Sequence, residues 1–104
     1  MLSAGIPNEV RRAVYRRDHY ACALCDDNRH LQIHHAIHRS QGGSNSPHNL
    51  ITLCHRCHAL AHGTNLYKAD GIDTLTPEDV NQAIVEYLAD LYAPDWDPWE
   101  TFPP

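Results

Sequence analysis

Two Cys-x-x-Cys pairs frame the part of this sequence that could do metal chemistry. Both pairs lie between residues 22 and 62, a stretch that also holds eight of the nine histidines. Paired cysteines at this spacing are typical of structural zinc sites, in which four thiolates fill a tetrahedral coordination shell. Such a closed site leaves no position for water, so it stabilises a fold and does not catalyse. The four predicted zinc ligands are Cys22, Cys25, Cys54 and Cys57.

Helical phase separates the histidines from the cysteines and predicts a second metal centre. Residues 54–62 have a helical pattern, and a helix turns by roughly 100° per residue. On that rule, the midpoint of the cysteine pair and the midpoint of His58 and His62 differ by roughly 90°. The two residue types should therefore bind separate ions, and the histidine centre should be the more open one.

His34 and His35 are adjacent at the end of a predicted strand. Successive side chains of a strand point to opposite faces, so only one of the two can directly face an ion held by His58. Its neighbour can then act beside that ion. The histidines without a spacing argument are interpreted as ordinary surface or core residues, namely His19, His30, His48 and His55.

A β-hairpin followed by a helix is the predicted core, over residues 22–63. Alternating residues at 31–33 and the apolar run at 50–53 predict two short strands, the first of which continues into the two adjacent histidines. The Gly-, Ser- and Asn-rich residues 40–47 predict a surface loop between them, so the strands should pair antiparallel. The pattern then becomes helical until Gly63, a typical helix stop.

Helices are predicted on both sides of this core, which makes the chain one small α+β domain over residues 1–104. The first helix covers residues 8–18, with Asn8 as its N-cap. The second, over residues 77–92, is amphipathic and should pack on the core. Its inward side chains are predicted to be Val80, Ile84, Tyr87, Leu88 and Leu91. The acidic, aromatic tail, residues 93–104, either crosses the core or docks on a partner, and we expect catalysis to survive its removal.

The charge is divided unevenly along the chain. Residues 1–63 carry seven arginines and four acids, whereas residues 64–104 carry one lysine and nine acids, which gives the net charge of −5. The basic half permits a nucleic-acid partner that a uniformly acidic chain would disfavour. On the first helix, Arg12 and Arg16 share a face. That face is either simply solvated or contacts phosphates.

Neither a membrane span nor a signal peptide is expected. The sequence has no run of about 18 apolar residues, and its first ten residues lack the charged-then-apolar layout of a secretory signal. We therefore expect a cytosolic protein without a membrane partner. In a reducing cytosol, paired cysteines bind metal more readily than they form disulfides.

These motifs resemble those of the HNH endonuclease family, which has the ββα-metal fold. The matching residues are His34–Gly43, Asn49–Cys54 and Cys57–His58. The flanking Cys22-x-x-Cys25 and Arg17-Asp18 are similar to the cysteine-bearing branch that is common among phage and prophage proteins. The resemblance therefore implies a ββα-metal core with a structural zinc site.

The resemblance also implies a role for each matched residue. His35 corresponds to the general base, and Asn49 is the middle letter of the motif, bracing the loop between the strands. His34 and His58 correspond to ligands of a catalytic divalent cation. His62 lies where some members place a third ligand.

The leading hypothesis is therefore a metal-dependent endonuclease, a hydrolase of phosphodiester bonds in double-stranded DNA. His35 would activate water, and the cation would stabilise the phosphate and the leaving 3′ oxygen. Imidazole ligands suit Mn²⁺, Ni²⁺, Co²⁺ or Zn²⁺, and Mg²⁺ should also support activity. Arg39 matches a basic position that meets phosphate, whereas His38 replaces a proline found in many members.

The alternative hypothesis is a zinc-stapled nucleic-acid-binding module without catalytic activity. Its support is the positive charge of the N-terminal half, which any DNA-binding protein would show. For the endonuclease hypothesis, the resemblance is compatible with a phage or prophage origin, in genome packaging, restriction or repair. The expected setting is the cytosol of a bacterium or a phage-infected host, with packaging proteins such as terminase as partners.

Overall fold

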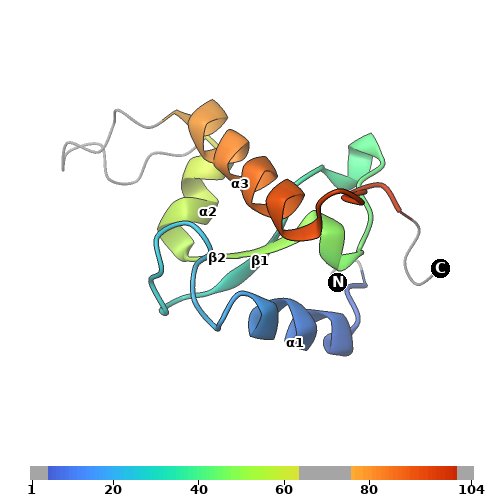
Figure 1. Cartoon of the computed structure of the whole chain (residues 1–104). Helices are drawn as coiled ribbons and strands as arrows, with labels where there is room; N and C mark the ends of the chain where they lie inside the picture. Colours follow the sequence, from blue (N-terminus) through green and yellow to red (C-terminus); the bar gives the residue numbers. More distant parts are fainter. Residues whose placement is uncertain (1–4, 64–75, 101–104) are drawn as a thin grey trace.

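The computed structural model describes residues 5–63 and 76–100, and it has the small α+β architecture expected from the sequence (Figure 1). The elements in chain order are α1 (Asn8–Arg17), β1 (Gln32–His35), η1 (Arg39–Gln41), η2 (Pro47–Asn49), β2 (Leu50–Leu53), α2 (His55–Ala61) and α3 (Pro77–Tyr92). β1, β2 and α2 form the ββα unit. The predicted antiparallel pairing of the two strands is confirmed.

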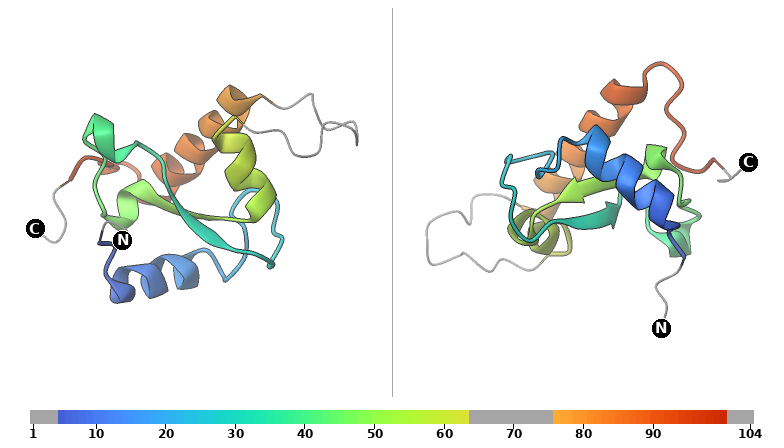
Figure 2. Two further views of the ribbon diagram at one scale, coloured as in Figure 1. Left: turned by 180° about the vertical axis from the view of Figure 1, so that it is seen from behind. Right: turned by 90° about the horizontal axis from the view of Figure 1, so that it is seen from below.

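The two-stranded sheet lies between two layers of helix (Figures 1 and 2). On one face, Leu50 packs with α1 residues Val10 and Val14. On the other face, Ile51 and Leu53 join a larger apolar cluster with α2 and α3. All four residues of β2 are buried in consequence. The second strand of the hairpin, β2, therefore lies at the centre of the molecule, between the two apolar clusters.

The start of α1 differs from the prediction. Pro7, not Asn8, is the N-cap, and no side chain caps the helix. The Pro7 carbonyl instead accepts hydrogen bonds from the backbone amides of Val10 and Arg11, both at 3.0 Å. The helix ends at Arg17, one residue earlier than expected, and the next side chain turns into the core.

An ion pair buried at the end of α1 connects this helix to β2 and α3. Arg17 binds the Asp18 carboxylate at 2.8 Å and also donates to the carbonyl of Leu50 and to the hydroxyl of Tyr92. Asp18, only 4 % exposed, accepts from the amide of Thr52 at 2.9 Å and from the hydroxyl of Tyr87 at 2.6 Å. The pair therefore ties α1 to β2 and to the C-terminal half of α3.

We expect Asp18→Asn to lower the free energy of unfolding by about 3 kcal/mol, because it leaves a buried guanidinium without its counter-charge. Burial opposes ionisation of Asp18, but the hydrogen bonds from Arg17 and Tyr87 outweigh it and lower the pKa of the carboxyl below 3.8. A lowered pKa stabilises the fold above that value, and this stabilisation is lost as pH falls through the folded-state pKa. Urea titrations at neutral pH and below pH 4 measure both effects.

Asp90→Asn is the matched control, because Asp90 is an exposed acid on α3. It should unfold like the wild type at every pH. The wild type should lose stability on acidification, whereas Asp18→Asn should lose less over the same range. Equal stability of the two chains at neutral pH would contradict the role given to this ion pair.

α3 begins and ends where the sequence predicts. Thr76 and Asp79 form a reciprocal capping box at its N-terminus. Ile84 and Leu88 are fully buried against the core, but Leu91 is 45 % exposed, so its predicted inward position was wrong. Tyr92 takes the inward place at the helix end, where its ring stacks on that of His48 at 4.0 Å.

The described part of the tail crosses the loop between the two strands. The Trp96 indole donates to the carbonyl of His48 at 2.7 Å, and the carbonyl of Pro98 accepts from the amide and the hydroxyl of Ser44. Ser46, fully buried, donates to the Glu100 carboxylate at 2.6 Å. These contacts argue against the expectation that catalysis survives removal of the tail.

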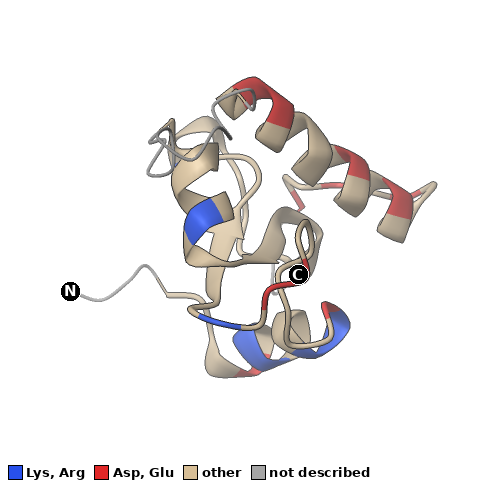
Figure 3. Cartoon of the chain, turned by 90° about the vertical axis from the view of Figure 1, so that its left-hand side faces the viewer, with Lys and Arg blue, Asp and Glu red and all other residues tan. Residues whose placement is uncertain are grey.

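Charge is distributed over the fold as it is along the chain. Figure 3 shows acidic residues gathered along α3, whereas arginines lie on α1 and α2. Within the described ranges, no helix has both the length and the apolar character that crossing a membrane requires.

Candidate functional site: two separate metal centres

The four cysteines converge on one point. Their Sγ atoms all lie within 4.8 Å of one another, and those of Cys25 and Cys54 are 3.5 Å apart. Zinc–sulfur bonds of about 2.3 Å in a tetrahedron place neighbouring sulfurs about 3.8 Å apart. The donor set and its spacing therefore fit zinc.

The local backbone conformation orients the cysteine side chains toward one another. The Cys22 carbonyl accepts from the amide of Asp26, whose positive φ of 69° closes the first turn tightly. Cys54 is the N-cap of α2, and its sulfur accepts from the amide of Cys57 at 3.5 Å. Helix N-termini and amide donors favour thiolates over thiols. The hydrogen bond between the thiols of Cys22 and Cys57 lowers the pKa of Cys22 and raises that of Cys57.

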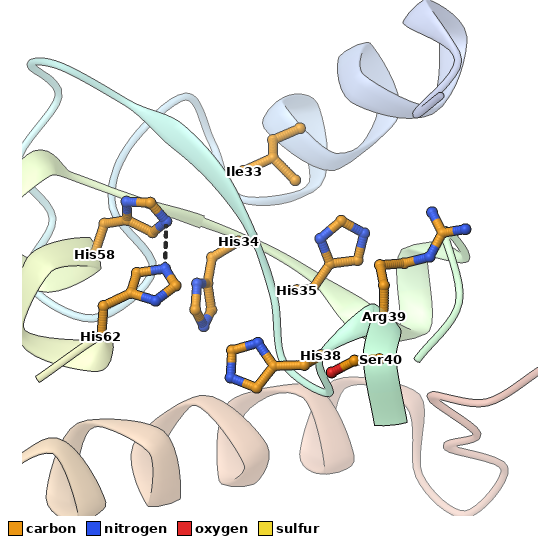
Figure 4. A pocket seen from close by; sticks show the side chains of 8 residues that line it. All are labelled: Ile33, His34, His35, His38, Arg39, Ser40, His58 and His62. Atoms are coloured by element: carbon orange, nitrogen blue, oxygen red, sulfur yellow. Dashed lines mark hydrogen bonds between the residues drawn. The ribbon is translucent and has the colours of Figure 1, made fainter. Parts of the chain in front are cut away.

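Three histidines form the second group, separate from the cysteines. One ring nitrogen of each lies within 4.8 Å of the others, and the Nε2 atoms of His58 and His62 are 3.1 Å apart. His34 lies edge-on to both rings, at centroid distances of 5.2 and 5.1 Å. Figure 4 shows the rings converging from β1 and α2. Metal–nitrogen bonds of about 2.0–2.1 Å suit this spacing.

Burial keeps the deepest histidine neutral. His34 is only 4 % exposed, and this burial, together with the neighbouring imidazoles, lowers its pKa to about 3. The pKa of His58 is also lowered, mainly by burial and to a smaller extent by the charge of His62. Neutral imidazole is the form that binds a metal. The site is thus prepared to hold a cation at neutral pH.

His35 points to the opposite face of the strand. Register pairs His34 with Ile51 and His35 with Leu50, and side chains directly opposite across an antiparallel pair share a face. His34 therefore faces α2, while His35 is on the α1 side. His35 is the last residue of β1, and both histidines line the same pocket of about 370 Å³ along the edge of the strand.

The rim of this pocket comes from the loop after β1. His38, Arg39 and Ser40 complete its lining, together with Ile33 and the four histidines already described (Figure 4). Arg39 therefore shares a pocket with His35, as a phosphate contact would need to. Arg12 and Arg16 lie elsewhere, on the exposed side of α1.

Asn49 connects the two ends of that loop. It is fully buried, its side-chain oxygen accepts from the amide of Ile37 at 2.7 Å, and its nitrogen donates to the carbonyls of Ile37 and Ser44. The backbone passes so close here that a Cβ at Gly43 would overlap the Ile37 carbonyl. The loop is therefore held in one conformation next to His35.

A family model described as HNH endonuclease matches residues 22–64, which hold both the cysteine and the histidine groups. Residues 22–64 are thus an HNH endonuclease domain. Such a domain implies a nuclease-type function with a metal site and a nucleic-acid substrate in general. This HNH chain is also 38 % identical, over 60 residues, to Anaredoxin from Nostoc sp. (strain PCC 7120 / SAG 25.82 / UTEX 2576). The match spans 54 % of this chain and 79 % of that protein.

Two features of the HNH domain had no role in the sequence interpretation. Asn45 hydrogen-bonds to His35 at 2.9 Å, although a loop rich in Gly, Ser and Asn offered no signal that singles it out. His38 was noted only as the replacement of a proline, yet its ring lies 6.2 Å from that of His62. Both depend on how the loop folds back over the strand, which sequence spacing does not describe.

Proposed function

We propose that this chain is a metal-dependent endonuclease that hydrolyses phosphodiester bonds of DNA. The observation that carries the proposal is the convergence of His34, His58 and His62 on one point, with His35 across the edge of β1 in the same pocket. A protein that only binds nucleic acid needs a folded surface and a zinc staple. It has no use for three converging imidazoles beside a fourth.

The residues in and beside the pocket would divide the reaction into separate tasks. His34, His58 and His62 would hold a divalent cation, which when bound supplies charge stabilisation at the phosphate and at the leaving 3′ oxygen. His35 would take a proton from the attacking water. Arg39 would bind a non-bridging phosphate oxygen, since its guanidinium carries donors in phosphate-like spacing. Asn49 would brace the loop that carries Arg39 and lies next to His35.

Three neutral nitrogen donors favour particular cations. Imidazole suits Mn²⁺, Co²⁺, Ni²⁺ and Zn²⁺, whereas Mg²⁺ prefers oxygen ligands. We therefore propose that Mn²⁺ or Ni²⁺ supports faster cleavage than Mg²⁺. On α1, Arg12 and Arg16 would contact phosphates of double-stranded DNA away from the cleaved bond.

Plasmid nicking tests the proposal, and we expect His35→Ala to lower the nicking rate by about 10²–10⁴-fold, the usual contribution of a general base. Gln32→Ala, on the same strand, is the control and should nick like the wild type. Zinc content and the circular dichroism spectrum should be unchanged in both variants. Equal nicking by wild type and His35→Ala would exclude the assigned base.

The second candidate function is a zinc-stapled nucleic-acid-binding module without catalysis. The exposed Arg12 and Arg16 favour it as much as they favour the nuclease. DNA binding without metal-dependent cleavage by the wild type would support it. A phage or prophage origin, a cytosolic setting and packaging partners such as terminase stay hypotheses that rest on the resemblance alone.

A further inference from the structure

The hydrogen-bond partner of the proposed base is a residue to which the sequence interpretation gave no role. Asn45 lies between η1 and η2, and its side-chain oxygen is 2.9 Å from Nε2 of His35. The same oxygen accepts a hydrogen bond from the Arg39 guanidinium, also at 2.9 Å. Figure 4 shows His35 and Arg39 on the same side of β1, away from the three converging histidines. One amide thus joins the proposed base to the proposed phosphate contact.

The chemistry of these partners determines which ring nitrogen of His35 carries the proton. An arginine side chain can only donate hydrogen bonds, so the Asn45 atom facing it must be the carbonyl oxygen. The Asn45 nitrogen donates to the carbonyl of Gly5 at 3.3 Å, in agreement with that orientation. An oxygen acceptor requires hydrogen on Nε2 of His35. In a neutral imidazole, Nδ1 then holds the lone pair.

The residues on either side of Asn45 are held by the C-terminal segment. The amide and hydroxyl of Ser44 donate to the carbonyl of Pro98 at 3.1 and 3.2 Å. The buried Ser46 donates to the Glu100 carboxylate at 2.6 Å. The backbone of Asn45 is therefore fixed on both sides, which allows its side chain to keep one orientation toward the strand.

We propose that Asn45 is a positioning residue that holds His35 in the Nε2–H tautomer and so presents Nδ1 as the base. The proposal rests on the proposed nuclease function of the pocket. A hydrogen bond on one ring nitrogen commonly sets the tautomer and orientation of a catalytic histidine. Because Arg39 shares the same oxygen, Asn45 also keeps the phosphate contact at a fixed distance from the base.

Nitrogen NMR of ¹⁵N-histidine-labelled protein tests the tautomer directly and without any substrate. At a pH high enough for a neutral ring, wild-type His35 should show a single Nε2–H tautomer. Asn45→Ala should show a mixture of the two tautomers, and Asn45→Asp, which keeps an oxygen acceptor, should restore the single form. An Nδ1–H tautomer in the wild type, or identical tautomer populations in wild type and Asn45→Ala, would overturn the proposal.

Nicking kinetics test the consequence for catalysis. Asn45→Ala should lower kcat by about 10–100-fold, as loss of a supporting hydrogen-bond partner typically does, with a smaller change in KM. Asn45→Asp should recover most of the lost rate. Gln41→Ala, an exposed residue of the same loop, should leave both constants unchanged. An unaltered kcat in Asn45→Ala, alongside an inactive His35→Ala, would refute the role of Asn45.

Failure of the proposed nuclease function and failure of the role proposed for Asn45 give different results. If the wild type does not nick DNA with any cation, the proposed nuclease function fails. The NMR spectra still decide whether Asn45 sets the tautomer of His35, because they need no turnover. Thermal unfolding of each variant shows whether a lost activity reflects a lost fold.

Discussion

Replacing His58 by alanine should abolish metal-dependent nicking while zinc and the fold stay in place. His58 contributes one of three converging nitrogens, and two imidazoles alone hold a divalent cation weakly. Losing a residue that only supports a metal ligand costs up to about 100-fold in activity. Because His58 is itself a proposed ligand, we expect the nicking rate to fall by at least about 100-fold. The rate at saturating Mn²⁺ and the affinity for Mn²⁺, measured by calorimetry, check this.

His55→Ala is the matched control, because His55 is an exposed histidine of the same helix. It should bind Mn²⁺ and nick DNA like the wild type. The His58 variant should retain one zinc per chain, since the cysteine group is separate. Undiminished nicking by His58→Ala at low Mn²⁺ would show that the histidines do not hold the catalytic ion.

Removing the zinc should unfold the chain. Structural zinc contributes about 10–16 kcal/mol in small domains, as much as or more than the whole unfolding free energy of a typical domain. Cys22 and Cys57 are buried in the main apolar cluster, so losing the ion also leaves their thiols in an unsupported core. Cys57→Ser should therefore lose zinc, helical circular dichroism and cooperative thermal unfolding together.

Ala59→Ser, which puts the same serine side chain on the same helix without touching the cysteines, should keep all three properties. Strong chelators should reproduce the Cys57→Ser phenotype in the wild type. A zinc-free chain with a cooperative melting transition near that of the wild type would contradict the structural role of the cysteines.

Much of the core could be predicted because the deciding interactions are local. The limits of α3 follow from Thr76 and a helical apolar repeat, and the pairing of the strands follows from two short β-favouring runs. Helical phase alone separated the cysteines from His58 and His62, and the described residues contain these two separate groups. Capping residues, apolar repeats and helical phase all depend on residues that are close together in the sequence.

The rest depends on contacts between distant residues. Asp18 contacts Thr52 and Tyr87, which are 34 and 69 positions away in the chain. A periodic sequence pattern does not predict contacts between residues so far apart. Leu91 continues the apolar repeat but ends up exposed because Tyr92 takes the inward place on His48. Asn45 is recognisable only once the loop has folded back to His35. Burial and long-range hydrogen bonds decide these positions.

Metal dependence of nicking at constant zinc content is the most direct test of two separate centres, one structural and one catalytic. Protein dialysed against mild chelator should retain one zinc per chain by native mass spectrometry and should not nick plasmid DNA. Added Mn²⁺ should restore nicking without displacing that zinc. Full nicking by the dialysed protein, or no nicking with any added divalent cation, would contradict the account.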